Sequence, residues 1–186
     1  MNKKEKQIQK DYLINCAGKG HYTNLDAPEK LLRYANRTNG QSNYDLITWG
    51  GLGILEFLDM ITNIDLFEHV QRKRSRKGNF GRYMDHEIYS FSDESEASIK
   101  KYNVDVDKLA RKMAYDFYNT DNCQVIYAVH KPSEKDTHMH IHFVINTVNF
   151  VNCNKRRENM RQTKEREARF REMTERAIAQ CMHGKQ

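Results

Sequence analysis

The stretch CQVIYAVHKPSEKDTHMHIHFVINTVNF, residues Cys123–Phe150, decides the fold of this chain. It contains two apolar runs, Cys123–Val129 and Met139–Phe150, and both are rich in the Val, Ile, Tyr and Phe residues that are typical of strands. A short polar loop joins the runs and holds one of the two prolines of the chain. The stretch therefore predicts an antiparallel pair of strands.

Histidines gather at the loop end of both predicted strands. His130 ends the first strand, and His138, His140 and His142 alternate along the second. Alternate residues of a strand share one face and lie roughly 7 Å apart at Cα, so two neighbouring histidines of this row can converge on one ion. In a tight antiparallel pair, His130 falls across from them on the same face. Three imidazoles suit Zn, Mn, Fe, Ni or Cu and leave positions open for a substrate. The alternative is a surface cluster of histidines that binds no metal.

The string AVHKPSEKDTHMHIHFVIN resembles the third motif of conjugative relaxases of the MOBP type, within the HUH endonuclease group. That motif has Val-His at a strand end, a polar loop, and then His-X-His followed by an Asn. The resemblance implies that His130, His140 and His142 are the metal ligands and that Asn146 closes the motif. His138 is additional to the pattern, so the choice of two ligands among His138, His140 and His142 stays open.

Length and composition fit one domain, or one domain with an appendage. The 186 residues include no apolar run of membrane length and no apolar core of a signal peptide near the start, so we expect no membrane insertion. The four cysteines are scattered without a CxxC pair, which favours the reducing cytoplasm, here of a bacterial cell, over a disulfide scaffold. We expect a nuclease domain over residues 1–154 and a charged helix over residues 155–186 that packs on this domain or extends from it.

Basic residues form two blocks within a net charge of +6. Such a block by itself is often a solvated face, but beside a metal motif it favours a nucleic-acid partner. We therefore expect DNA contacts from Arg72, Lys73, Arg74, Arg76, Lys77, Lys155, Arg156 and Arg157.

The remaining segments alternate between helical and strand patterns. Apolar residues at helical spacing predict four helices, at residues 27–37, 54–70, 105–118 and 162–182. Strands are expected at residues 44–48 and 86–91, and residues 11–17 are either a short strand or a helix end. These elements predict an α+β fold in which a central antiparallel sheet carries packed helices and a charged helix ends the chain. The relaxase resemblance implies the same fold, with the histidine-bearing strands at the centre of the sheet.

A nucleophile that forms a covalent intermediate is needed to cut DNA and hold one end. A tyrosine hydroxyl performs this role when a metal takes up charge on the phosphate. Relaxases of the similar family carry this tyrosine on a helix near the N-terminus in the pattern LxxY. The segment EKLLRYANRTNG fits that pattern, which nominates Tyr34, with Tyr22 and Tyr44 as alternatives.

A second family motif is a strand that ends in Ser-Phe and has a histidine a few residues earlier. The segment HEIYSF supplies His86 and Ser90, and the similarity implies that Ser90 helps to hold DNA near the cut. Glu87, next to His86, is a candidate acidic partner that orients a metal-bound imidazole through its second nitrogen.

Together these features predict a site- and strand-specific relaxase for plasmid or integrative-element transfer. Tyr34 is expected to form a 5′-phosphotyrosine link with single-stranded DNA at a transfer origin, with Mn or Mg as the metal and Zn as an alternative. Accessory relaxosome proteins are further expected partners. The competing interpretations are a rolling-circle replication initiator, a metal-dependent nuclease that uses water, and a non-catalytic DNA-binding module.

Overall fold

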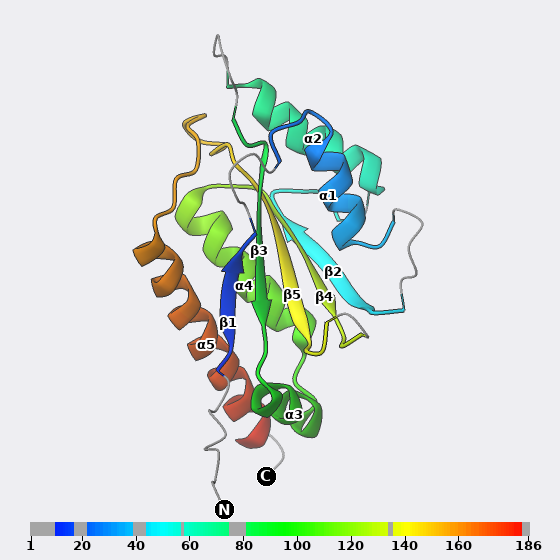
Figure 1. Cartoon of the computed structure of the whole chain (residues 1–186), viewed down its shortest axis with the longest axis vertical. Coiled ribbons are helices and arrows are strands. Elements are labelled where there is room, and N and C mark those ends of the chain that lie inside the picture. Colours follow the sequence, from blue (N-terminus) through cyan, green and yellow to red (C-terminus); the bar gives the residue numbers. More distant parts are fainter. Residues whose placement is uncertain are drawn as a thin grey trace, which may run out of the picture.

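Five antiparallel strands form one sheet in the computed structural model, which describes residues 10–16, 22–38, 44–56, 58–74, 81–133 and 136–183 (Figure 1). The strands are β1 (Tyr12–Asn15), β2 (Leu46–Leu52), β3 (Met84–Ser90), β4 (Val125–His130) and β5 (His140–Asn146), in the order β1-β3-β5-β4-β2. β5 is the middle strand and pairs directly with β4. The predicted α+β class and the hairpin of histidine-bearing strands are therefore confirmed.

Helices cover both faces of this sheet. They are α1 (Ala27–Ala35), α2 (Met60–Arg72), α3 (Asp93–Tyr102), α4 (Val106–Asp121) and α5 (Met160–His183). α4 and α5 share one core with the inner strands, through residues such as Phe117, Phe143 and Phe170. α1 and α2 form a second core with the opposite face, through Leu32 and Phe67. The described helices include none with the length and apolar content of a membrane span.

Residues of β5 alternate between these two cores because successive side chains of a strand point to opposite faces. Ile141 and Phe143 belong to the core under α4 and α5, whereas Val144 belongs to the core under α1 and α2. His140 and His142 share the Val144 face. Burial of the apolar half therefore fixes the direction in which the histidines point.

β2 continues through two glycines that the sequence pattern had placed after the strand. A Cβ on Gly50 would lie 2.5 Å from Tyr127 Oη, and a Cβ on Gly51 would lie 2.6 Å from Val125 O. Glycine is the residue that permits such a close approach to a neighbouring strand. These glycines therefore allow the seven-residue β2 to pair with β4 from Leu46 to Leu52, with a register shift between Leu46 and Thr48.

Two helices differ from the prediction because capping residues define their starts. α2 begins only at Met60, since the Asp59 side chain accepts a hydrogen bond from Thr62 N and caps it there. α3 was not predicted. Its only buried residues are Glu96 and Ile99, so it has no apolar stripe, and it depends on the Ser92 cap and an acidic first turn.

Arg156 connects the segment before α5 to the core through hydrogen bonds. Its guanidinium donates to Asp85 at 2.8 Å, Glu87 at 2.9 Å and Asp121 at 2.7 Å, and its side chain is 2% exposed. Buried charges in proteins require such partners. Arg156 is thus bonded inside the fold and is not available to DNA, so the prediction made from its place in the basic block is wrong.

Candidate active site

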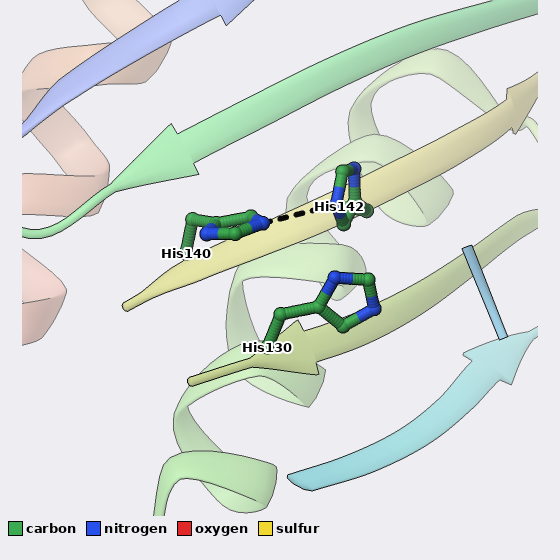
Figure 2. A group of neighbouring side chains, drawn as sticks. All are labelled: His130, His140 and His142. Carbon is green, nitrogen blue, oxygen red and sulfur yellow. Dashed lines mark hydrogen bonds between the residues drawn. The ribbon is translucent and has the colours of Figure 1, made fainter. Parts of the chain in front are cut away.

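Three histidines converge at one end of the central hairpin. His130 at the end of β4 and His140 and His142 on β5 point toward one another (Figure 2). The register explains the arrangement, because His130 lies directly across from His140 and His142 lies across from Ala128. All three side chains are buried, and one nitrogen from each lies within 4.8 Å of the others. The structure thus brings together the three residues that the motif nominated, in a group that can hold a metal ion.

Backbone carbonyls fix the tautomers of two of these histidines. His130 Nε2 lies 2.8 Å from Ala35 O, and His140 Nδ1 lies 2.9 Å from His138 O. A carbonyl oxygen only accepts, so both of these nitrogens carry hydrogen and the lone pairs are on His130 Nδ1 and His140 Nε2. His140 Nε2 is 3.1 Å from His142 Nε2, a spacing that suits two nitrogens bound to one ion at about 2.0–2.1 Å. The donor set therefore fits a divalent metal.

His86 on β3 forms a hydrogen bond with His142, the third histidine of the triad. His86 Nε2 lies 2.8 Å from His142 Nδ1, and His86 Nδ1 lies 3.0 Å from Tyr22 Oη. If His142 Nε2 gives its lone pair to a metal, His142 Nδ1 must carry the hydrogen and donate it to His86 Nε2. His86 then donates its own Nδ1–H to the Tyr22 oxygen. Such outer contacts orient a ligand imidazole and fix its tautomer.

Glu87 does not take this supporting role. It lies on the opposite face of β3 from His86, because neighbouring strand residues point to opposite sides of the sheet. There it accepts a hydrogen bond from Arg156, and burial raises the pKa of its carboxyl to about 8 despite the opposing effect of Arg156. The prediction for Glu87 is wrong, and the hydroxyl of Tyr22 contacts His86 instead.

Burial favours the neutral form of three histidines at the site, His86, His130 and His142. Burial, together with the nearby imidazoles, lowers the pKa of His86 to about 4. Burial also lowers the pKa of His130 to about 4, against the hydrogen bond to Ala35 O and with a further contribution from Arg37. The pKa of His142 falls well below its ordinary value, first through burial and then through His86. Neutral imidazole is the form that binds metal, so these side chains need no deprotonation at pH 7.

The same low pKa values predict a loss of stability in acid. In the unfolded chain His86 and His130 take up protons near pH 6.5, whereas in the folded protein they stay neutral down to about pH 4. Unfolding therefore binds protons between these values, and the free energy of unfolding should fall as the pH drops from 6.5 to 4, by about 1–2 kcal/mol per histidine at pH 5. Urea titrations in chelator at pH 7.5 and 5 measure this change. His86→Gln should show a smaller loss than the wild type, and an equal loss in the two proteins would contradict the assignment.

Tyr34 and Ser90 line a groove beside the triad. This groove has a volume of about 230 Å³, and His140, His142 and Tyr12 also line it. Tyr34 projects from α1, and its ring centroid lies 5.7 Å from that of His142. Ser90 lies directly across from His140 in the β3–β5 register. The structure therefore places both predicted residues next to the histidines.

The two alternative tyrosines lie in different surroundings. Tyr22 lines a hollow of about 590 Å³ together with Tyr34 and His86. Tyr44 is 81% exposed. The Tyr22 hydroxyl is hydrogen-bonded to His86 of the histidine cluster.

Asn146 and His138 lie outside the triad. Asn146 Nδ2 donates to Phe67 O at 3.0 Å and to Gln124 Oε1 at 2.8 Å, so this side chain ties α2 and the start of β4 to the end of β5. His138 precedes β5, and its Nδ1 lies 3.3 Å from Asp93 Oδ1. These positions leave His140 and His142 as the two histidines that join His130.

Arg37 and Asp45 belong to the site, and the sequence analysis missed both. Arg37 donates to the Asp45 carboxylate from Nε at 3.0 Å and from Nη2 at 2.6 Å. The same Nη2 lies 3.1 Å from His130 Nδ1, and the guanidinium carbon lies 5.0 Å from the centre of the Tyr34 ring. Arg37 follows the end of α1 and has a φ of 56°, so helical spacing did not indicate its position beside Tyr34.

The basic blocks meet at the opposite end of β5. Arg74 donates to Cys153 O at 2.9 Å, and Lys155 donates to Thr147 Oγ1 at 2.8 Å and to Arg82 O. Burial lowers the pKa of Lys155 to about 8. The other described residues of the two blocks that remain DNA-binding candidates are exposed: Arg72, Lys73 and Arg157. Arg76 and Lys77 lie outside the described residues.

A protein-family model described as "Relaxase: MobA/VirD2-like, nuclease domain" matches residues 50–177. This chain belongs to that relaxase family. The match includes Ser90 and the histidine triad, whereas Tyr34 and Arg37 precede it. Membership confirms the predicted relaxase family and assigns the domain to DNA nicking in conjugation or mobilisation.

A solved structure shares the fold of this relaxase. The conjugative relaxase TrwC in complex with oriT DNA, in a metal-bound structure, superimposes with a TM-score of 0.52 at 12% sequence identity. The similarity covers 92% of this chain and 70% of the TrwC chain. No curated protein sequence matches this chain.

Proposed function

We propose that this relaxase nicks single-stranded DNA at a transfer origin and retains the 5′ end on Tyr34. The observation that carries the proposal is the position of Tyr34, whose ring lies 5.7 Å from that of His142 and lines the same groove as His140. A hydroxyl nucleophile, a donor set for a metal and an open groove then occupy one site. The TrwC structure, which contains oriT DNA and a metal, has the same fold and supports this proposal.

In the proposed reaction the Tyr34 oxygen attacks the scissile phosphorus after losing its proton. A P–O bond to Tyr34 forms while the bond from phosphorus to the 3′ oxygen breaks, and that oxygen leaves as a 3′-hydroxyl once it gains a proton. A divalent ion, Mn or Mg with Zn as the alternative, would supply positive charge to the phosphate oxygens when held by His130, His140 and His142. In this proposal Ser90, which lies across from His140, donates a hydrogen bond to a phosphate of the bound DNA strand.

The phosphotyrosine product keeps the reaction reversible. One phosphodiester bond is replaced by another of similar kind, so a free 3′-hydroxyl can attack Tyr34-linked DNA and rejoin the strand. A water-using nuclease would lose this ability.

The exposed basic residues suggest the path of the DNA. β5 has seven residues, so the cluster around Arg74 and Lys155 lies about 20 Å from the triad along the strand. We propose that the bound single-stranded DNA runs from the groove toward Arg72, Lys73 and Arg157, where phosphate contacts would make DNA binding salt-dependent. Transfer-origin DNA, accessory relaxosome proteins and a bacterial cytoplasmic location are part of the same proposal.

A covalent-adduct assay tests this function. The protein would be incubated with Mn²⁺ and labelled single-stranded oligonucleotides from the transfer region of its own element, and then run on a denaturing gel. We expect a shifted protein–DNA band with Mn²⁺ and no such band when excess chelator is present, because the chelator removes the divalent ion that the proposed reaction needs. Cleavage without any shifted band would favour water as the nucleophile. Binding without cleavage would favour a non-catalytic module.

A further inference from the structure

The Arg37 guanidinium is held inside the active site in a conformation that costs energy. Its side chain is 7% exposed, and its backbone φ of 56° lies in the left-handed region that disfavours residues with a Cβ. Such strain is typical of functional positions. The conformation directs the guanidinium to Asp45 on one side and to His130 on the other.

The Arg37 guanidinium and a bound metal ion would both interact with the lone pair of His130 Nδ1. His130 Nε2–H is committed to Ala35 O, so Nδ1 is the only nitrogen of His130 that can accept a hydrogen bond or bind a metal. Arg37 Nη2 donates to that nitrogen at 3.1 Å. A metal ligated by His130 Nδ1 must therefore displace this hydrogen bond.

Displacement releases one Nη2 proton of Arg37. Its Nε and its other Nη2 proton still donate hydrogen bonds to the Asp45 carboxylate, and Nη1 still donates to the backbone carbonyl of Tyr34 at 3.2 Å. The guanidinium also stacks 5.0 Å from the centre of the Tyr34 ring, so an acceptor for the released proton would lie beside the nucleophile. A phosphate oxygen suits this position, because arginine binds phosphate in a directed, charge-assisted way.

We propose that Arg37 and the metal compete for His130 Nδ1, and that the scissile phosphate ends the competition by accepting the Arg37 hydrogen bond. The proposal rests on the relaxase function above and adds a coupling to it. Because DNA removes the competitor of the metal, metal and DNA should strengthen each other's binding. The site would then assemble fully only on its substrate.

Metal affinity measured without DNA separates this proposal from a purely structural role. Mn²⁺ binding to the whole chain would be followed by calorimetry for wild type, Arg37→Gln and Arg37→Gln/Asp45→Asn. The double variant keeps the net charge of the wild type and leaves no unpaired Asp45 carboxylate. We expect both variants to bind Mn²⁺ about tenfold more tightly than wild type, because a charge-assisted hydrogen bond to the ligand is gone.

Arg33→Gln is the matched control. Arg33 lies on α1, four residues before Arg37, and pairs with Glu29 at 2.8 Å, so this change removes an equal charge without touching His130. It should leave Mn²⁺ affinity within about twofold of the wild type. If Arg37→Gln and the double variant bind Mn²⁺ as the wild type does, or more weakly, Arg37 only closes α1 and the proposal is wrong.

The coupling to DNA is measured in a second arm. In the Tyr34→Phe background, an oligonucleotide from the transfer region should raise Mn²⁺ affinity by a larger factor than it does in Tyr34→Phe/Arg37→Gln. Equal factors in the two proteins would overturn the coupling. Failure of the proposed function has a different signature, since wild type would then bind no Mn²⁺ or form no covalent adduct.

Discussion

Tyr34→Phe should abolish the covalent protein–DNA adduct and lower the rate of nicking by roughly a thousandfold or more, the size of loss expected when a nucleophile is removed. The substitution deletes only the hydroxyl. The phenylalanine ring retains the edge contact with His142 and the stacking with Arg37, so the fold and the metal site should be unchanged. Single-turnover cleavage of a labelled oligonucleotide with Mn²⁺ gives the rate, and a thermal melt checks the fold.

Two other tyrosines provide the controls. Tyr12 lines the same groove on β1, and Tyr12→Phe should retain the adduct. Tyr22→Phe removes the hydroxyl that contacts His86 Nδ1 and should lower the rate by about tenfold without loss of the adduct. An adduct that persists in Tyr34→Phe and vanishes in Tyr22→Phe would transfer the role of nucleophile to Tyr22.

Substitutions of three histidines should change Mn²⁺ affinity to different extents, from a large loss to none. His142→Ala removes a ligand and should cost more than about a hundredfold in affinity, together with nearly all nicking activity. His86→Gln keeps the ligands and alters only the contact at 2.8 Å to His142 Nδ1, so we expect a loss of about 10–100-fold. His138→Ala should bind Mn²⁺ like the wild type, because His138 lies before β5 and points to Asp93.

Calorimetry on the three variants checks this order. His138→Ala is a close control, since it removes the same side chain from a position two residues before His140. A loss in His138→Ala as large as that in His142→Ala would mean that His138 and His140 form the metal pair. An unchanged affinity in all three variants would exclude a metal site at this end of the sheet.

Much of this arrangement followed from strand periodicity. His140, His142 and Val144 alternate with apolar residues, and this alternation predicts which face each side chain occupies. Burial of the apolar face fixes the strand in that orientation. The hairpin register then brought His130 across from His140. α3 was not predicted because it has no apolar stripe. Its Ser92 cap and the buried residues Glu96 and Ile99 stabilise it instead.

Contacts between distant segments were harder to predict. Glu87 looked like a partner of His86 because it is adjacent in sequence, yet adjacent strand residues face opposite sides, and Glu87 pairs with Arg156 instead. The Arg37–Asp45 pair depends on how the end of α1 meets the start of β2, which no local pattern specifies. The same holds for Tyr22, whose contact with His86 joins positions 64 residues apart.

Mass spectrometry of the trapped adduct tests the proposed mechanism most directly. Trypsin cleaves after Arg33 and Arg37, so Tyr34 lies in its own short peptide, residues 34–37, and Tyr22 lies in a different one. The adduct should be digested with trypsin and nuclease, and the peptide that carries the residual nucleotide identified. We predict that residues 34–37 carry it through a phosphodiester on Tyr34. A nucleotide on the Tyr22 peptide, or efficient cleavage with no modified peptide at all, would contradict the mechanism.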